Sequence, residues 1–475
     1  MNRYCLAAAL AALCAAGAAL DPASGQEPEF VWAQAHPDRP GADGQLIARA
    51  LVAADAPCPA ARLGDAEAAM QERPNGTDAD FAVKVCELVY DGALPARIGA
   101  VALAPRPADP RRILVVGDTG CRITEYAAQA CNDPSAWPWQ RIARLGAAQQ
   151  PDLIIHIGDY HYREKPCAGR ADCAGSPAGD SWPAWRADFF APAAELLPVA
   201  PWVMLRGNHE ECARAGTGWQ LLLAPVPGTA LHPPCVNDTE PYRLALGRLQ
   251  LAVLDSATAG NTFARVQRTA EYEAMMQKLA PSLAAQPGAA AAETWLLLHH
   301  PLWISYGGCA TTSPFRCIQR DLLQDAQQVV KAEAAPLPAA DLTQLSRELA
   351  ANLQDPLGAL RAWFAERPPG PVSMVLSGHA HAFQLFAPKR RSPAIPLQLV
   401  VGTGGDALDR YPALKTQTAP QPAEVYGVAG ELWSRQEFGF AMLTRGDGGW
   451  TATFHDVAGT AKLACDLAAR SCNVP

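Results

Sequence analysis

Five short motifs occur in order along this chain of 475 residues, and each follows an apolar run. In chain order they are Gly117-Asp118-Thr119-Gly120, Gly158-Asp159-Tyr160-His161-Tyr162, Gly207-Asn208-His209-Glu210, His299-His300-Pro301 and Gly378-His379-Ala380-His381. The preceding runs have the continuous apolar pattern of strands that are covered on both faces. Because ligands bind at the carboxyl ends of parallel strands, polar motifs at these positions constrain the fold strongly.

The apolar runs and the segments between them predict an α/β fold. Residues 113–116 and 153–157 are apolar, and residues 139–149 between them have helical spacing and end before Pro151. A strand, a helix and a strand at this distance form a βαβ unit. Further strands are expected at residues 202–205, 249–254, 295–298 and 374–376, surface helices within residues 320–366, and a final hairpin at residues 438–440 and 450–454.

The length suggests more than one domain. Residues 27–104 contain turn signals such as Asn75-Gly76 and short β-prone runs such as residues 81–85. They predict a small all-β domain, a sandwich of the immunoglobulin or fibronectin kind. The Pro-rich residues 105–110 are interpreted as a linker, and residues 111–475 as the catalytic domain.

The N-terminus predicts export. Arg3 precedes an Ala- and Leu-rich stretch at residues 6–20, followed by small residues with cleavage expected near Ala18 or Gly25. Residues 1–25 are therefore interpreted as a signal peptide. A membrane anchor is the alternative, but the stretch is short for a span of ~20 apolar residues. We expect a periplasmic or secreted protein.

The cysteines agree with export. Fourteen cysteines minus Cys5 and Cys14 leave twelve, an even number. None of them forms a Cys-x-x-Cys pair. Pairing of neighbours predicts six bridges: Cys58/Cys86, Cys121/Cys131, Cys167/Cys173, Cys212/Cys235, Cys309/Cys317 and Cys465/Cys472.

Charge and composition exclude some classes of protein. An apolar content of 49% indicates a globular protein with a sizeable core. The net charge of −8 argues against a protein that coats nucleic acid. It does not define the charge of a substrate, because bound metal ions would dominate the local field. We expect neither a nucleic-acid-binding surface nor a membrane association, and the sequence leaves the oligomeric state open.

The motif residues are of the types that bind metals. Asp118 and Asp159 open consecutive strand-to-helix loops, and one carboxylate can bridge two cations that lie ~3.5–4 Å apart. His379 and His381 are two residues apart and share a side of an extended segment. Taken alone, an aspartate or asparagine after glycine is often only a cap or a turn. Five such motifs at successive strand ends favour a metal site.

With these motifs the chain resembles the calcineurin-like metallophosphoesterases, and among them the purple acid phosphatases. The family pattern is Asp-x-Gly, Gly-Asp-x-x-Tyr, Gly-Asn-His-Glu/Asp, Val-x-x-His and Gly-His-x-His. The resemblance covers residues 111–475 and implies a catalytic four-layer α/β/β/α sandwich. Leu296 replaces the valine of the fourth motif, and counting from Leu296 makes His299 the ligand and His300 a neighbour.

The resemblance to the purple acid phosphatases in particular depends on the loss of one ligand and the gain of another. Other family members have a metal-binding histidine at the position of Gly120. Tyr162 occupies the place where the purple enzymes have a tyrosinate ligand. A phenol has an unperturbed pKa of ~10, so ligation at neutral pH requires a strongly acidic ion such as Fe(III). The alternative is that Tyr162 only packs beneath the loop.

The resemblance assigns the ligands of two metal ions. Asp118, Asp159, Tyr162 and His381 would bind Fe(III). Asp159, Asn208, His299 and His379 would bind a divalent ion (Fe, Zn or Mn), with Asp159 as the bridge. The implied reaction is attack of a metal-bound hydroxide on phosphorus.

The remaining candidates surround the ligands. His209 would face the substrate phosphate and protonate the departing alcohol. A second histidine, which some relatives have after the fourth motif, is missing from residues 303–309. Arg122 and Arg206 are candidates for substrate binding, as is Arg163, and His161 is a candidate for supporting a ligand. For each of them the alternative is a structural role.

The main reading is therefore an exported enzyme that hydrolyses phosphomonoesters of small molecules. One alternative is a phosphodiesterase or nucleotidase with the same metal site. Another is a secreted binding protein whose metals are structural. All seven ligand positions and His209 are present, which argues against the second alternative. The loops that shape the pocket would decide between the first two.

Overall fold

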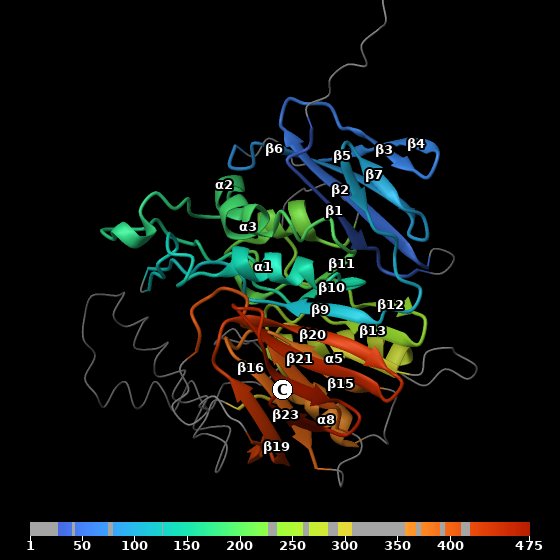
Figure 1. Ribbon diagram of the computed structural model, residues 1–475, viewed down its shortest axis with the longest axis vertical. Helices are drawn as coiled ribbons and strands as arrows, with labels where there is room; N and C mark the ends of the chain where they lie inside the picture. The colour runs from blue at the N-terminus through green and yellow to red at the C-terminus, as the bar shows by residue number, and fades with distance from the viewer. Residues whose placement is uncertain are drawn as a thin grey trace, which may run out of the picture.

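The computed structural model describes residues 27–39, 43–74, 79–125, 127–226, 235–259, 266–283, 293–305, 357–366, 372–389, 395–409 and 419–475. Two large β-sheets dominate this part of the chain (Figure 1). The first has eleven described strands. Their order across the sheet is β23 (Ser471–Asn473), β22 (Ala461–Asp466), β21 (Gly449–Asp456), β20 (Gly439–Gly446), β9 (Arg112–Val116), β10 (Leu153–His156), β11 (Trp202–Met204), β1 (Phe30–Ala35), β2 (Gln45–Ala53), β6 (Val83–Asp91) and β5 (Gln71–Arg73).

The second sheet has eight described strands, and a smaller sheet belongs to the N-terminal region. The order in the second sheet is β12 (Tyr242–Leu246), β13 (Leu249–Val253), β14 (Glu293–Leu297), β15 (Val372–Ser377), β17 (Leu397–Val401), β16 (Phe383–Pro388), β19 (Val428–Arg435) and β18 (Gln421–Val425). The small sheet has the order β4 (Ala66–Ala69), β3 (Ala60–Leu63), β7 (Ala96–Ile98) and β8 (Val101–Leu103).

Few helices cover the sheets in the described residues. The α-helices are α1 (Trp139–Ala148), α2 (Trp182–Trp185), α3 (Ala191–Ala193), α4 (Gly216–Gly218), α5 (Val266–Leu283) and α8 (Gly358–Glu366). The other helical segments are the 3₁₀ helices η1 (Ala171–Cys173) and η3 (Asn208–Glu210) and the π-helices η2 (Arg186–Phe190) and η4 (Trp219–Leu223).

Alternating side chains of the first sheet build two cores. In β9, Ile113 and Val115 point to the second sheet and pack in a core that includes Leu251. Leu114 of the same strand points the other way and packs with Trp139 of α1. Successive side chains of a strand point to opposite faces, so β9 is covered on both. The residues of β9 form a continuous apolar run because both faces of the strand are buried.

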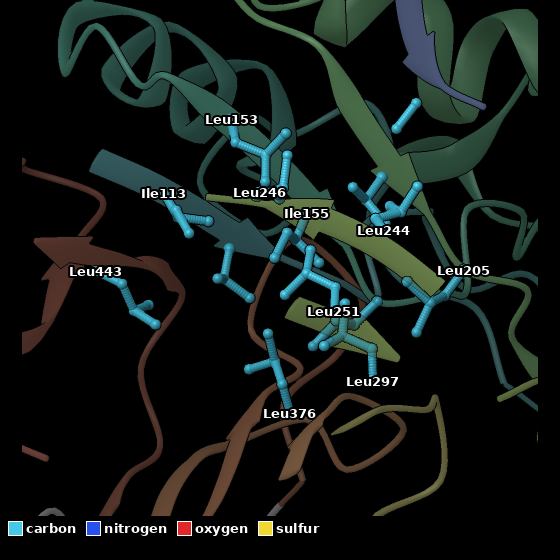
Figure 2. Close-up of a cluster of buried hydrophobic side chains, with 14 of the residues drawn as sticks. Ile113, Leu153, Ile155, Leu205, Leu244, Leu246, Leu251, Leu297, Leu376 and Leu443 are labelled. Atoms are coloured by element: carbon cyan, nitrogen blue, oxygen red, sulfur yellow. The ribbon is translucent and has the colours of Figure 1, made fainter. Parts of the chain in front are cut away.

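The second sheet is covered in the same way. Leu251 and Leu297 contribute to the core between the sheets (Figure 2). Leu296 faces outward and packs in a third core with Tyr272 of α5 and Leu360 of α8. Helices, sheet, sheet and helices therefore follow one another, and the predicted four-layer α/β/β/α sandwich is confirmed.

Several sequence predictions correspond to elements of the structure. The apolar runs are strands β9, β10, β11, β13, β14 and β15, and residues 139–149 contain α1. Strands β20 and β21 pair as the predicted final hairpin. Of the helices expected within residues 320–366, α8 is described, whereas residues 320–356 lie outside the described residues. The predicted signal peptide, residues 1–25, lies outside them as well.

The N-terminal region is all-β, as predicted, but four of its strands extend the first sheet. Strand β1 pairs in parallel with β11 at Gln34 and Trp202, and β2, β6 and β5 follow outward. In Figure 1 these strands, in blue, continue the sheet from β11. This pairing could not be predicted from the sequence, since the residues of an edge strand do not indicate which strand it pairs with. The boundaries at residues 104 and 110 stay predictions.

A buried polar cluster joins the N-terminal strands to the segment after the third motif. Glu87 Oε2 lies 3.0 Å from Arg73 Nη1 and 3.5 Å from Arg49 Nε, and all three side chains are at most 5% exposed. The two guanidinium groups also donate to backbone carbonyls within residues 220–226. Burial and the nearby Arg73 lower the pKa of Arg49 to about 9. Glu87 therefore compensates two buried cations.

Five of the six predicted cysteine pairs are disulfides. The bonded pairs are Cys58–Cys86, Cys121–Cys131, Cys167–Cys173, Cys212–Cys235 and Cys465–Cys472. The sixth predicted pair, Cys309/Cys317, lies outside the described residues. In the part of the chain that the structure describes, no helix is both long and apolar enough to cross a membrane.

Replacement of Glu87 by glutamine tests the polar cluster. Because it leaves two buried cations without a compensating charge, Glu87→Gln should lower the free energy of unfolding by about 3 kcal/mol. Urea denaturation measures this difference. The control is Glu72→Gln, since Glu72 is 51% exposed and lies 3.5 Å from Lys84 Nζ; a change within about 0.5 kcal/mol is expected for it. Equal losses in both variants would contradict the role of Glu87.

Candidate metal centre

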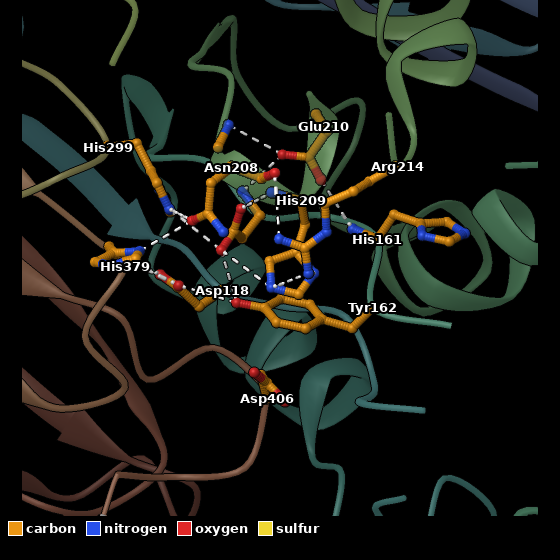
Figure 3. A network of polar contacts seen from close by, with 12 residues as sticks. Asp118, His161, Tyr162, Asn208, His209, Glu210, Arg214, His299, His379 and Asp406 are labelled. Atoms are coloured by element: carbon orange, nitrogen blue, oxygen red, sulfur yellow. Dashed lines mark hydrogen bonds and ion pairs between the residues drawn. The ribbon is translucent and has the colours of Figure 1, made fainter. Parts of the chain in front are cut away.

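The ends of five strands bring the motifs together. Strands β9, β10 and β11 run parallel in the first sheet, and β14 and β15 run parallel in the second. A motif follows each of these strands. Since the carboxyl ends of parallel strands meet at one edge, the motif side chains of both sheets gather in one place (Figure 3).

One group of donor atoms surrounds the Tyr162 hydroxyl. Tyr162 Oη lies 3.2 Å from Asp118 Oδ1, 2.8 Å from Asp159 Oδ2 and 3.0 Å from His381 Nε2. His381 Nε2 is also 3.4 Å from Asp118 Oδ1. Neighbouring ligands of an octahedral ion with bonds of about 2.1 Å are separated by about 3 Å. The four atoms are therefore spaced as the ligands of one ion are.

A second group surrounds the Asn208 amide oxygen. Asn208 Oδ1 lies 3.0 Å from His299 Nε2 and 2.9 Å from His379 Nδ1. His299 Nε2 is also 3.2 Å from Asp159 Oδ2, the oxygen that contacts Tyr162. The same carboxylate thus belongs to both groups. All seven residues expected as ligands converge, and their donors fit two cations that share Asp159.

Electrostatics of the buried groups also favours cations. Burial raises the pKa of Asp118. Although burial opposes its charge, the carboxylate of Asp159 raises the pKa of His299 to about 9. Burial and the charge of His299 lower the pKa of His379 to about 3, so His379 is neutral and able to bind a metal. Metal binding should therefore release protons from His299 and its neighbours.

Three of the converging residues have a left-handed backbone. The φ angles are 56° at Asp118, 60° at Asp159 and 68° at His379. Residues other than glycine rarely adopt this conformation, and it persists where the surroundings enforce it. Hydrogen bonds do so here: the Asp118 N–H donates to Gly158 O at 3.0 Å, and the His379 N–H donates to Asp118 Oδ1 at 3.1 Å. Such strain clusters at functional sites.

Glu210 holds the loops of the second and third motifs together. Its carboxylate accepts hydrogen bonds from the backbone N–H groups of Asp159 at 2.9 Å, Tyr160 at 2.8 Å, His161 at 3.1 Å and Gly207 at 3.0 Å. Burial and the charge of Asp159 raise its pKa to about 8. Glu210 belongs to the third motif, but no role was predicted for it from the sequence.

Asp188 fixes the loop that carries Tyr162. Its carboxylate accepts from the backbone N–H groups of Cys121 at 3.0 Å and Tyr162 at 2.7 Å, and from Arg163 Nε at 2.6 Å. Asp188 was not predicted as a site residue because it lies in the π-helix η2, far from any motif in the sequence. No pattern around it in the sequence distinguishes it from a surface aspartate.

Glycines at the motifs allow the loops to approach. A Cβ atom at Gly207 would overlap the carboxylate of Asp159, and one at Gly378 would lie 2.6 Å from Asp118 Oδ2. At Gly120, a Cβ would lie 2.7 Å from Tyr160 O and 2.9 Å from Tyr162 Cδ2. A histidine at position 120 does not fit this arrangement. Tyr162 therefore lies close to the place that the side chain of a histidine at position 120 would need.

His209 lies beside the donor groups. Its ring centre is 3.7 Å from that of Tyr162, and its Nε2 is 4.0 Å from Asp159 Oδ2. Its Nδ1 lies 2.8 Å from Glu164 Oε1. Burial and the neighbouring Arg214 lower the pKa of His209. Glu164 and Arg214 both contact His209, and neither was predicted from the sequence to belong to the site.

The two arginines expected at the substrate differ in their surroundings. Arg122 Nη2 lies 3.0 Å from His381 Nδ1, and Arg122 forms an ion pair with Asp406 while its side chain is 28% exposed. Arg206 is paired with Asp255, with Nη2 2.8 Å from Oδ2, and only 1% of its side chain is exposed. These contacts favour a structural role for Arg206.

The other neighbours of the motifs make structural contacts. Arg163 is paired with the buried Asp188. His161 Nε2 lies 2.9 Å from Gly179 O, and its ring points away from the cluster (Figure 3). The His300 ring centre is 4.0 Å from that of His379. Neither nitrogen of the His300 ring has a hydrogen-bond partner among the described residues, whereas His299 Nε2 faces Asn208 and Asp159.

Comparisons with known proteins agree with this geometry. Residues 111–383 match the model of the calcineurin-like phosphoesterase family, and the chain belongs to this family. A purple acid phosphatase, PPD1 from yellow lupin (Lupinus luteus) seeds, has a similar structure: the TM-score is 0.53 at 14% identity, and the match covers 92% of this chain and 73% of that chain. PhoD is similar with a TM-score of 0.50 at 11% identity, covering 92% and 89%. Comparison with curated proteins gives no significant match.

Family membership sets the class of reaction. The protein is a metal-dependent phosphoric ester hydrolase, and the family implies two metal ions at the centre described above. At such low identity, the two solved structures show the shared fold. The fold and the resemblance of the motifs to those of purple acid phosphatases thus agree.

The close approach at Gly207 provides a test of the centre. Gly207→Ala should reduce bound metal to less than half of the wild-type amount, because the added Cβ displaces the Asp159 carboxylate. Elemental analysis of the purified protein measures the metal, and circular dichroism checks the fold. Gly446→Ala is the control, since a Cβ there meets nothing within 4 Å. Unchanged metal content in Gly207→Ala would contradict the ligand geometry.

Proposed function

We propose that the protein is an exported phosphatase that hydrolyses phosphomonoesters of small molecules at a centre of one Fe(III) and one divalent ion. Asp118, Asp159, Tyr162 and His381 would hold the iron. Asp159, Asn208, His299 and His379 would hold the divalent ion (Fe, Zn or Mn). The observation that carries the proposal is the Tyr162 hydroxyl, which lies within 3.2 Å of donor atoms of Asp118, Asp159 and His381.

The surroundings of Tyr162 explain the choice of Fe(III). Burial and the carboxylates of Asp159 and Asp118 raise the pKa of Tyr162 well above its usual value. Its phenolate therefore forms only beside a strongly acidic cation, and a trivalent ion meets this requirement better than a divalent one. When bound, the two ions supply Lewis acidity, which activates water and offsets charge on the phosphoryl oxygens.

The chain's own residues position the substrate and move a proton. His209 Nδ1 lies 2.8 Å from Glu164 Oε1, and its Nε2 lies 4.0 Å from Asp159 Oδ2 of the centre. The protonated Nε2 donates to the oxygen of the departing alcohol, so that the alcohol leaves neutral. Arg122, beside His381, binds a phosphoryl oxygen with its partly exposed guanidinium group.

Export is supported by the disulfides. Five bridges are present in the described residues, and disulfides persist in oxidising compartments. Together with the N-terminal stretch that resembles a signal peptide, they support a periplasmic or secreted protein. Sequencing the N-terminus of the mature protein from culture tests this, with a start near residue 26 as the expected result.

Turnover of two aryl phosphates tests the substrate class. The metal-loaded protein should hydrolyse p-nitrophenyl phosphate at least about 10-fold more efficiently, in kcat/KM, than bis(p-nitrophenyl) phosphate. Removal of the metals by a chelator should abolish both reactions. Faster hydrolysis of the diester would favour the phosphodiesterase alternative. No hydrolysis of either compound by the metal-loaded protein would favour a binding protein with structural metals.

The role of His209 predicts a loss of kcat with an intact centre. His209→Ala should lower kcat for p-nitrophenyl phosphate by about 10²- to 10⁴-fold, the range for a lost general acid, while the metal content stays unchanged. The control is His455→Ala, since His455 stacks on Phe440 and its Nδ1 lies 3.3 Å from Gly459 O, and neither partner is a proposed ligand. A kcat within a factor of two of wild type in His209→Ala would contradict the assignment.

A further inference from the structure

Arg214 is a cation at the centre that no motif includes. Its Nη2 lies 2.7 Å from Nδ1 and 3.0 Å from Nε2 of His209, so the guanidinium group contacts both nitrogens of the imidazole ring (Figure 3). Its Nε donates to Glu164 Oε1 at 2.7 Å. Arg214 thus contacts both the proposed proton donor and the carboxylate that orients it.

The orientation of Arg214 leaves donors for a ligand. Among the described residues, its Nη1 makes one long contact, 3.4 Å to Asn208 O. Its side chain is 25% exposed, whereas that of Arg206, near the same motif, is 1% exposed. A guanidinium group has five donors in a planar fork that matches phosphate oxygens. Arg214 is therefore anchored on one side and open on the other.

The backbone around Arg214 holds it in this position. The disulfide Cys212–Cys235 begins two residues before it, and the Arg214 N–H donates to Glu211 O at 2.9 Å. Glu164, which is only 20% exposed, accepts from Arg214 Nε at 2.7 Å and anchors the guanidinium group. The group therefore has little freedom to lose on binding a ligand.

We propose that Arg214 binds the phosphoryl group of the substrate on the side of His209 and makes the centre selective for dianionic phosphomonoesters. This inference deepens the proposed function and rests on it. Arg122 beside His381 and Arg214 beside His209 would then both contact the phosphate.

Two arginines at the phosphate would distinguish phosphomonoesters from phosphodiesters by their charge. A phosphomonoester carries about −1.5 to −2 charges near pH 7, because its second pKa is about 6. A diester carries one charge and has an additional substituent in place of one oxygen. Loss of one arginine therefore costs a monoester more than a diester. A merely structural role of Arg214, as a support of His209, would affect both substrates equally.

Phosphate binding and the ratio of two substrates test the inference in the metal-loaded full-length protein. Arg214→Ala should raise the dissociation constant of inorganic phosphate, measured by titration calorimetry, by about 10- to 100-fold. It should lower kcat/KM for p-nitrophenyl phosphate by a similar factor, and that for bis(p-nitrophenyl) phosphate by less than about 5-fold. Arg214→Lys, which keeps the charge and loses the fork, should show an intermediate effect.

The control and the contradicting results are distinct. Arg144→Ala removes a surface arginine whose Nε lies 2.6 Å from Glu195 Oε1, with 57% of its side chain exposed, and should change neither quantity. A phosphate dissociation constant within a factor of two of wild type in Arg214→Ala, or equal losses with both substrates, would overturn the inference. Because calorimetry needs no turnover, an inactive wild-type protein would contradict the proposed function and leave the phosphate measurement to decide on Arg214.

Discussion

The Asp159 carboxylate connects the two halves of the centre, and much of the surrounding structure holds it in place. Its Oδ2 lies 2.8 Å from Tyr162 Oη and 3.2 Å from His299 Nε2, and its Oδ1 accepts the His209 N–H at 2.9 Å. The left-handed backbone at Asp159 turns the carboxylate toward both sheets. Glu210 fixes that backbone from behind, and the missing side chain of Gly207 gives it room. The position of the shared Asp159 oxygen thus depends on a strained backbone at Asp159, on the close approach that Gly207 allows, and on the buried Glu210.

The apolar cores explain why this strain is tolerated. The core between the sheets fixes the strand ends of β9, β10, β14 and β15 relative to one another, since side chains of both sheets, such as Ile155 and Leu297, belong to this one core. Because a close-packed interior has low compressibility, the strand ends that carry the loops are held in fixed positions. The Glu87 cluster adds a polar connection between the N-terminal strands and residues 220–226, which follow the third motif.

The sequence predicted the strands and the seven converging residues because both have local signals. A doubly covered strand must be apolar throughout, and metal-binding side chains are few in kind. The pairing of β1 with β11 had no such signal, since backbone hydrogen bonds at a sheet edge do not depend on residue type. Asp188, Glu164 and Arg214 were missed for a related reason. Their roles depend on which loop lies opposite, and charged residues near a motif are common on surfaces as well. Arg206 shows the converse, because its place beside a motif in sequence leads in the structure to an ion pair with Asp255.

The visible absorption spectrum of protein made with export and disulfide formation, with metals counted on the same sample, tests the central claim most directly. The claim is that Tyr162 binds Fe(III) in a centre of two metals. It predicts two metals per chain, including iron, and a broad violet charge-transfer band that is absent in Tyr162→Phe. Two metals without the band, or a band that persists in Tyr162→Phe, would contradict it.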